Sequence, residues 1–266
     1  MNKLKLFFYL FHFFLASNAF AQLTASNEFS LSLGATNFSL LDQHASPLVY
    51  QMTAPSIGFH FSKNKPQWRW EIEAQATLGN LQIQRDDLAF NLTNRFFQPR
   101  TSMFHLQYGW LKNVVKKDKF QTYLGGKLRY EFWQDFDSVA NWAWGIGQGS
   151  LQLAGRQEFI LKNEQQITLE LAIPIVGLIT RLPYNLIPRI PDQSPGVASF
   201  FATGTRLTSL HQYRSLFFNI GYQKALNERW QVGLKIQTDL YYYELPAPVR
   251  ARQQQLQLNL TYRWSN

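Results

Sequence analysis

Residues 255–264 read Q-L-Q-L-N-L-T-Y-R-W and alternate without a break between polar and apolar side chains. The apolar positions are three leucines followed, at the same spacing, by Tyr262 and Trp264. Because successive side chains of a β-strand point to opposite faces, one face of this strand is wholly apolar and the other wholly polar. A strand of a soluble sandwich can share this pattern, so the rest of the chain decides between a water-facing sheet and a wall that faces lipid.

The same alternation recurs throughout the chain and predicts an all-β fold, a single antiparallel transmembrane β-barrel of about ten strands. The expected strands are residues 28–38, 56–61, 67–78, 102–110, 120–132, 149–161, 165–175, 215–224, 230–243 and 255–264. Short connections alternate with long ones, which is typical of outer-membrane barrels and places both chain ends in the periplasm. The long connection 176–214 contains an apolar stretch at 197–206, where an added hairpin would give the alternative of twelve strands.

The N-terminus carries the features of an export signal. Lys3 and Lys5 precede a run of apolar residues. Ala19-Phe20-Ala21 follows that run and matches the A-x-A pattern of a signal-peptide cleavage site. A basic start, an apolar centre and a site of this kind are typical of a secretory signal peptide. We therefore expect a cleaved signal at residues 1–21 and an outer-membrane β-barrel domain at residues 22–266, located in the bacterial outer membrane.

The charged residues inside the expected strands all fall on the polar face. They are Glu28, Arg69, Glu71, Glu73, Lys127, Arg129, Glu131, Arg156, Glu158, Glu170, Lys235, Asp239 and Arg263. A lysine or arginine that faces lipid at mid-membrane costs about 2–4 kcal/mol, so a lipid-facing wall excludes such residues. Acidic and basic residues are nearly balanced on this face, and inward neighbours such as Arg69 and Glu71 have opposite charges.

The balance of charge on the inward face bears on whether ions can pass through the barrel. A barrel of about eight strands is just filled by side chains, whereas open aqueous pores need about 16–18 strands. Since buried charges persist only when they are paired, we expect a lumen filled by ion pairs that does not conduct. A narrow channel for small solutes is the alternative.

The export signal, the alternation and the terminal strand together resemble bacterial outer-membrane β-barrel proteins. In that family the last strand typically ends in an aromatic residue that the barrel-assembly machinery reads, and Trp264 matches this residue. Ser265 and Asn266 follow it here, which departs slightly from the family pattern. The resemblance implies outer-membrane lipid and the barrel-assembly machinery as partners, and it indicates no specific member.

Signs of an enzyme are weak. Ten-stranded barrels include the omptin proteases, whose sites combine two aspartates with an Asp-x-His motif. Here Asp86 and Asp87 are adjacent rather than spaced by one, and Ser209 stands where the aspartate would precede His211. The histidines lack metal-ligand spacing, and the chain has no cysteine. We therefore expect no catalytic residue, no metal and no cofactor, and the scattered basic residues argue against nucleic acid.

Basic residues separate by type between the two ends of the expected barrel. Every basic residue in the long loops is arginine, whereas the short connections hold mainly lysine. The planar fork of arginine binds phosphate and carboxylate at two points. We expect a structural or surface-binding barrel that acts through its extracellular loops, with Arg181, Arg189 and Arg206 as candidates for binding lipopolysaccharide phosphates. Solvated loop arginines without a ligand are the alternative.

Overall fold

The structure is a computed structural model, and it describes residues 26–43, 49–83, 100–136, 143–162, 164–181, 205–245 and 247–265. The expected export signal lies outside these ranges and stays a prediction. Among the described residues, no helix is long and apolar enough to cross a membrane.

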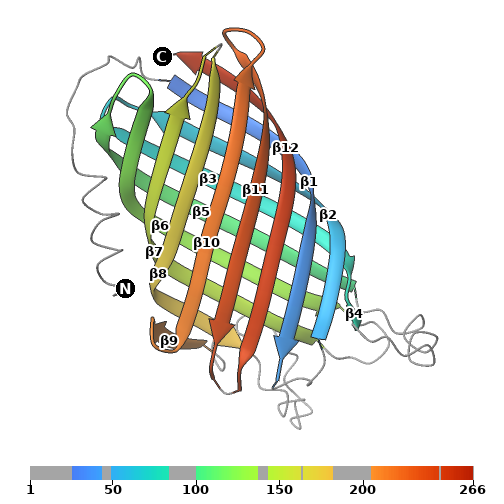
Figure 1. The fold of residues 1–266 in the computed structure, drawn as a ribbon. Coiled ribbons are helices and arrows are strands. Elements are labelled where there is room, and N and C mark those ends of the chain that lie inside the picture. Colours follow the sequence, from blue (N-terminus) through green and yellow to red (C-terminus); the bar gives the residue numbers. More distant parts are fainter. Residues whose placement is uncertain are drawn as a thin grey trace, which may run out of the picture.

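Ten long strands and two short ones make up the described chain (Figure 1). The long strands are β1 (Ser26–Asp42), β2 (Val49–Asn64), β3 (Trp68–Asn80), β5 (Arg100–Lys116), β6 (Phe120–Phe136), β7 (Ala143–Ile160), β8 (Gln165–Arg181), β10 (Tyr213–Ala225), β11 (Trp230–Tyr243) and β12 (Val249–Ser265). The short strands are β4 (Gln82–Ile83) and β9 (Thr205–Ser209). The prediction of an all-β fold is confirmed.

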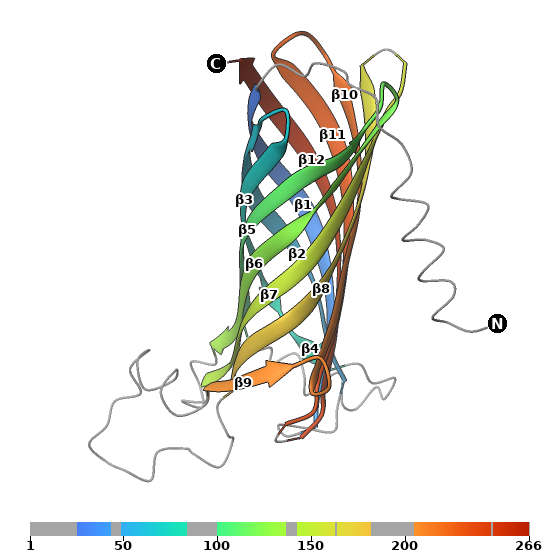
Figure 2. The same cartoon turned by 90° about the vertical axis from the view of Figure 1, so that its left-hand side faces the viewer.

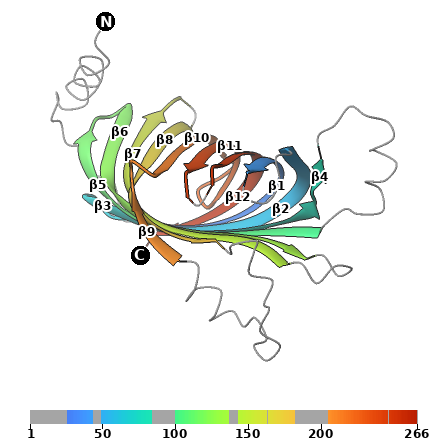
Figure 3. The same ribbon diagram turned by 90° about the horizontal axis from the view of Figure 1, so that it is seen from below.

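The long strands pair antiparallel with their neighbours, and the sheet closes on itself (Figure 3). Closure is made by β1, which pairs with β2 on one side and with β12 on the other. The ladder between β1 and β12 runs without interruption from Ser26↔Ser265 to Asp42↔Val249. A closed antiparallel barrel of ten strands is therefore confirmed. The two short strands pair with the long-loop ends of single strands of the ring, β4 with β2 and β9 with β8 (Figure 2).

The outer wall of the barrel is apolar over a broad belt. Leu33 on β1 is 65% exposed, and its pairing partner Leu258 on β12 is 63% exposed. At the end of the short turns, the rings of Trp68 and Trp110 stack with their centroids 4.8 Å apart, and Nζ of Lys112 lies 5.6 Å from the Trp68 ring. Lipid covers such a belt, and tryptophan and lysine are favoured where the belt meets water.

The chemistry of the two faces inverts toward the long-loop end of the barrel, at the bottom of Figure 1. Outward residues on β12 change from the exposed Leu256 to the exposed Arg252, while inward residues change from Gln257 to the buried Val249. Side chains keep alternating between the faces throughout the strand. The wall is therefore apolar outside and polar inside along the belt, and polar outside and apolar inside beyond it.

This inversion explains why most strands are longer than predicted. The predicted strands followed the apolar residues of the outward face and ended where that face becomes polar. Observed strands of the ring have 13 to 18 residues, whereas about 9–11 suffice to cross the hydrocarbon core. The added length lies mainly at the long-loop end, since β2 begins at residue 49 rather than 56 and β12 at 249 rather than 255.

Gly125 on β6 lies where two strand backbones approach closely. A Cβ atom at this position would overlap the carbonyl oxygen of Trp110 on β5 and would lie 2.8 Å from Cα of Leu111. Because backbone atoms cannot move aside as a flexible side chain can, we expect Gly125→Ala to lower the free energy of unfolding by about 1–3 kcal/mol. Equilibrium urea unfolding in detergent micelles, followed by tryptophan fluorescence, measures the change.

Gly126 supplies the matched control for this prediction. A Cβ atom there would have its nearest neighbour at 3.7 Å, an ordinary contact distance. Gly126→Ala is therefore expected to be neutral, or to stabilise by about 0.4–1 kcal/mol through the loss of freedom in the unfolded chain. Equal effects at the two glycines would contradict the close approach at Gly125.

Candidate functional site

The lumen is filled by ion-paired side chains at the level of the apolar belt. The side chain of Lys127 on β6 is 1% exposed, and its Nζ lies 2.6 Å from Oε1 of Glu71 on β3 and 2.5 Å from Oε1 of Glu170 on β8. One ammonium group thus joins three strands of the wall. Burial of an ammonium or a carboxylate costs several kcal/mol unless it is paired, so each of these groups depends on the others.

Two arginines extend this cluster toward the short-turn end. Nε of Arg69 lies 3.1 Å from Oε2 of Glu71, and its Nη1 lies 3.4 Å from Oε1 of Glu158 on β7. Nε of Arg156 lies 2.7 Å from Oε1 of Glu158, and its Nη1 lies 3.1 Å from Oε2 of Glu71. Each arginine therefore binds the glutamate two residues along its own strand and also a glutamate from the other strand.

The other inward charges are paired as well: Lys235 with Glu73, Arg263 with Glu28, and Arg129 with both Glu131 and Asp239. The structure thus gives every charged residue that the sequence placed in the lumen a partner of opposite charge. These residues are named the charge network below: Glu28, Arg69, Glu71, Glu73, Lys127, Arg129, Glu131, Arg156, Glu158, Glu170, Lys235, Asp239 and Arg263.

An apolar cluster, which the sequence reasoning missed, fills the lumen at the long-loop end. Its rings pack edge to face, with the Trp133 centroid 5.0 Å from that of Phe38 and 5.3 Å from that of Tyr241. Its signal in the sequence is a change of parity, because the apolar residues of β1 move from odd positions such as Leu33 to even positions such as Phe38. This cluster is named the apolar cap and consists of Phe38, Leu40, Met52, Ala54, Leu81, Met103, Trp133, Ile146, Ile179, Tyr213, Tyr241, Tyr243, Val249 and Ala251.

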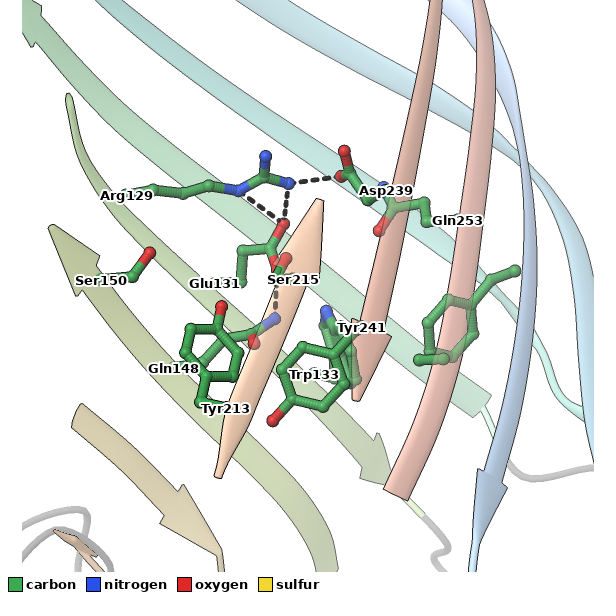
Figure 4. A pocket seen from close by; sticks show the side chains of 12 residues that line it. Arg129, Glu131, Trp133, Gln148, Ser150, Tyr213, Ser215, Asp239, Tyr241 and Gln253 are labelled. Carbon is green, nitrogen blue, oxygen red and sulfur yellow. Dashed lines mark hydrogen bonds and ion pairs between the residues drawn. The ribbon is translucent and has the colours of Figure 1, made fainter. Parts of the chain in front are cut away.

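A small cavity lies between the apolar cap and the charge network (Figure 4). It is lined by Arg129, Glu131 and Asp239 from the network and by Trp133, Tyr213 and Tyr241 from the cap. Its volume is about 10 Å³, about the space that one water molecule occupies. No solute larger than water fits into this cavity as it stands.

The three arginines expected in the outer loops have different outcomes. Arg181 is the last residue of β8 and points into the lumen, where it pairs with Asp42 and donates hydrogen bonds to two backbone carbonyl groups. The expectation that it lies in a surface loop is wrong, because β8 continues six residues beyond its predicted end at 175. Arg206 is exposed on β9, and Arg189 lies outside the described residues.

Ser209 and His211 form a hydrogen-bonded pair in the exposed turn between β9 and β10. Oγ of Ser209 lies 2.5 Å from Nδ1 of His211. No carboxylate in the described part of the chain pairs with this histidine, and Asp86 and Asp87 lie outside that part. The described residues likewise contain no group of three or more histidine or acidic side chains that could hold a metal ion. The pair is a local contact of the turn, and its geometry assigns no reaction.

Comparison with known proteins gives the fold a name. No protein-family model matches the sequence, and a comparison with curated proteins finds no match. Among solved structures, the outer membrane protease OmpT from Escherichia coli matches over 93% of this chain and 99% of that chain, with 9% identity and a TM-score of 0.50. This is the fold of a bacterial outer-membrane β-barrel.

Other outer-membrane β-barrels match less well. The translocator domain of the autotransporter NalP from Neisseria meningitidis has 7% identity and a TM-score of 0.43 over 98% of this chain and 95% of that chain. An outer membrane channel from Pseudomonas putida F1 has 12% identity and a TM-score of 0.42 over 92% of this chain and 96% of that chain. Because one fold can host many activities, the role of this outer-membrane β-barrel has to be argued from its own residues.

Proposed function

We propose that this outer-membrane β-barrel is a non-conducting protein that presents a binding surface at its long-loop end. The observation that carries the proposal is the filling of the lumen in two layers, the charge network along the belt and the apolar cap beyond it. The two layers exclude ions for different reasons. Each charge of the network has a partner of opposite charge, and the cap offers an ion only a few tyrosine hydroxyl groups with which to replace its water shell.

Planar-bilayer recording on the purified protein tests this proposal. We expect no stable conductance steps from the wild-type barrel, with insertion verified by recovering the folded, heat-modifiable form from the same membranes. A variant with a cleared lumen is expected to conduct, because it loses bulky members of both layers in charge-balanced pairs. Its substitutions are Trp133→Ala, Tyr241→Ala, Lys127→Ser, Glu170→Ser, Arg129→Ser and Asp239→Ser.

The outcome for the wild type decides between the two functions. Large, stable steps from the wild-type protein would contradict a closed lumen and would favour the narrow channel for small solutes. If neither protein conducts although both are folded and inserted, the charge network and the apolar cap are not what closes the lumen. The filled lumen would then no longer support the proposal.

A further inference from the structure

An arginine–tyrosine cluster occupies the outward face of β10, β11 and β12, beyond the apolar belt. Arg214, Tyr242 and Arg250 stand in one row, because Tyr242 pairs with Arg214 on one side and with Arg250 on the other. The guanidinium carbons of Arg214 and Arg250 lie 5.9 and 5.7 Å from the centroid of the Tyr242 ring. Arg252 is the next outward residue of β12, so three guanidinium groups share this small area of wall.

The position of the cluster places it at the edge of the lipid. Leu240, the outward residue of β11 next to Tyr242, belongs to the exposed apolar belt. On β12 the belt begins at Leu256, four residues from Arg252, which is about 13 Å along the strand. The guanidinium groups therefore project from the wall at the depth where lipid headgroups meet water, on the long-loop side. The three strands lie side by side in Figure 1.

The cluster has a large surplus of positive charge. Among the described residues, its acidic neighbour is Glu244, whose Oε1 lies 3.9 Å from Nη2 of Arg214, and both side chains of that pair are exposed. A pair of this length in solvent contributes little and yields readily to a competing anion. Within the described part of the chain, the side chain of Arg250 contacts the Tyr242 ring, and neither Arg250 nor Arg252 forms an ion pair. Both side chains are exposed, so a ligand can reach them.

The chemistry of these groups selects the class of ligand. A cation–π contact with the Tyr242 ring favours a position of the guanidinium group near that ring and does not use its N–H groups, which stay free to donate hydrogen bonds. The edge of a guanidinium group matches two oxygens of a phosphate, which a lysine ammonium cannot grip in the same way. The short-turn end of the barrel holds mainly lysines, such as Lys112 and Lys117, each over an aromatic ring, with Arg229 as an exception, so arginine predominates at the long-loop end.

We propose that Arg214, Tyr242, Arg250 and Arg252 form a binding site for the phosphate of a phosphorylated lipid of the outer leaflet. The site uses the membrane orientation of the proposed function, with the long loops outside, but it does not depend on a closed lumen. This site differs from the phosphate site expected from the sequence. Arg181, a residue of the expected site, pairs with Asp42 inside the barrel, whereas the proposed site lies on the outer wall rather than in the loops.

Native mass spectrometry of the barrel with lipid A in mixed detergent micelles tests this site. The variant Arg214→Lys/Arg250→Lys/Arg252→Lys keeps the charge and removes the forks, and we expect about tenfold weaker binding of phosphorylated lipid A. Lipid A without phosphate groups is expected to bind wild type and variant equally weakly. Glu244→Gln removes the competing carboxylate and is expected to strengthen binding by about twofold.

Arg100 supplies the matched control. It is exposed at the long-loop end of β5, and its cross-strand partners are Asn80 on β3 and Phe136 on β6, so no second arginine pairs with it. Arg100→Lys is expected to leave binding unchanged. Equal loss in this control and the triple variant, or unchanged binding in the triple variant, would overturn the proposal. Displacement of the lipid by inorganic phosphate at an equal phosphate concentration would assign the cluster to free phosphate and would overturn it as well.

These results are separate from the conductance experiment. The triple variant touches neither the charge network nor the apolar cap, so its behaviour in planar bilayers is expected to equal that of the wild type. A failure of the lipid site would leave the closed lumen standing, and a conducting wild-type barrel would leave the lipid site standing.

Discussion

Replacing Lys127 by methionine is expected to lower the free energy of unfolding by about 3–5 kcal/mol. Its ammonium group is buried between the carboxylates of Glu71 and Glu170, at 2.6 and 2.5 Å. Methionine fills most of the same volume but leaves two carboxylates in the lumen without this cation. Replacing a whole buried ion pair by apolar residues often leaves stability nearly unchanged. The cost of the single substitution therefore comes mainly from the buried carboxylates that are left without a cation.

Unfolding in urea, with the barrel in lipid vesicles, measures this effect through the tryptophan fluorescence of the chain. The double variant Lys127→Met/Glu170→Gln restores the balance of charge and is expected to recover at least half of the loss. Lys112 is exposed on β5 and gives the control, since Lys112→Met removes only an exposed contact with the Trp68 ring and is expected to change stability by less than about 1 kcal/mol. A Lys127→Met variant as stable as the Lys112→Met variant would show that the network does not support the wall.

Replacing Arg181 by leucine is expected to cost about 3–5 kcal/mol at the other end of the lumen. Arg181 pairs with Asp42 at the end of β1, and its Nη1 donates hydrogen bonds to the carbonyl oxygens of Leu245 and Ala247 at 2.9 and 2.7 Å. One guanidinium thus ties β8, β1 and the connection between β11 and β12 together. Without it, Asp42 loses its buried cation and two carbonyl groups lose their donor.

The same urea experiment tests this prediction, and hydrogen exchange at residues 243–249 reports on the connection. The double variant Arg181→Leu/Asp42→Asn is expected to recover much of the loss, because it removes the buried carboxylate together with its partner. Arg206→Leu, at an exposed arginine of β9, is expected to be nearly neutral. If Arg181→Leu weakened lipid A binding but not stability, its assignment to the lumen would be contradicted.

Much of the wall was predictable from the sequence because one physical rule governs it. Along the belt, lipid excludes charge, so the parity of Arg69, Glu71 and Lys127 indicated the inward face of each strand. Pairs two residues apart, such as Arg69 and Glu71, could be proposed for the same reason, because both side chains point into one lumen. The bridge from Lys127 to Glu170 could not, since the spacing along a strand gives no information on which side chains meet across the barrel.

Prediction failed where lipid gives way to water. There the outward face is polar and the inward face apolar, so a rule that places apolar residues outside predicts loops at the ends of β1, β2 and β12, where the structure has strand. This reversal hides most of the apolar cap, whose residues on strands such as β1 lie at the opposite parity. Arg181 points into the lumen for a second reason: a β-bulge at Ile175 shifts the alternation of β8, so odd-numbered residues face lipid before the bulge and the lumen after it. On β1 the apolar face lies at odd positions up to Leu33 and at even positions from Phe38. A strand prediction that allows such a switch between odd and even positions would give these strands their full length from the sequence alone.

The extra length of the strands raises the mouth of the barrel above the membrane. From Val249 to Gln255, β12 extends past the belt by about 20 Å along its axis, which at a tilt of about 40° is about 15 Å of height. The long-loop end of the wall is therefore a stiff collar that stands beyond the lipid belt. A molecule that approaches the membrane from that side meets this collar before it meets the lipid.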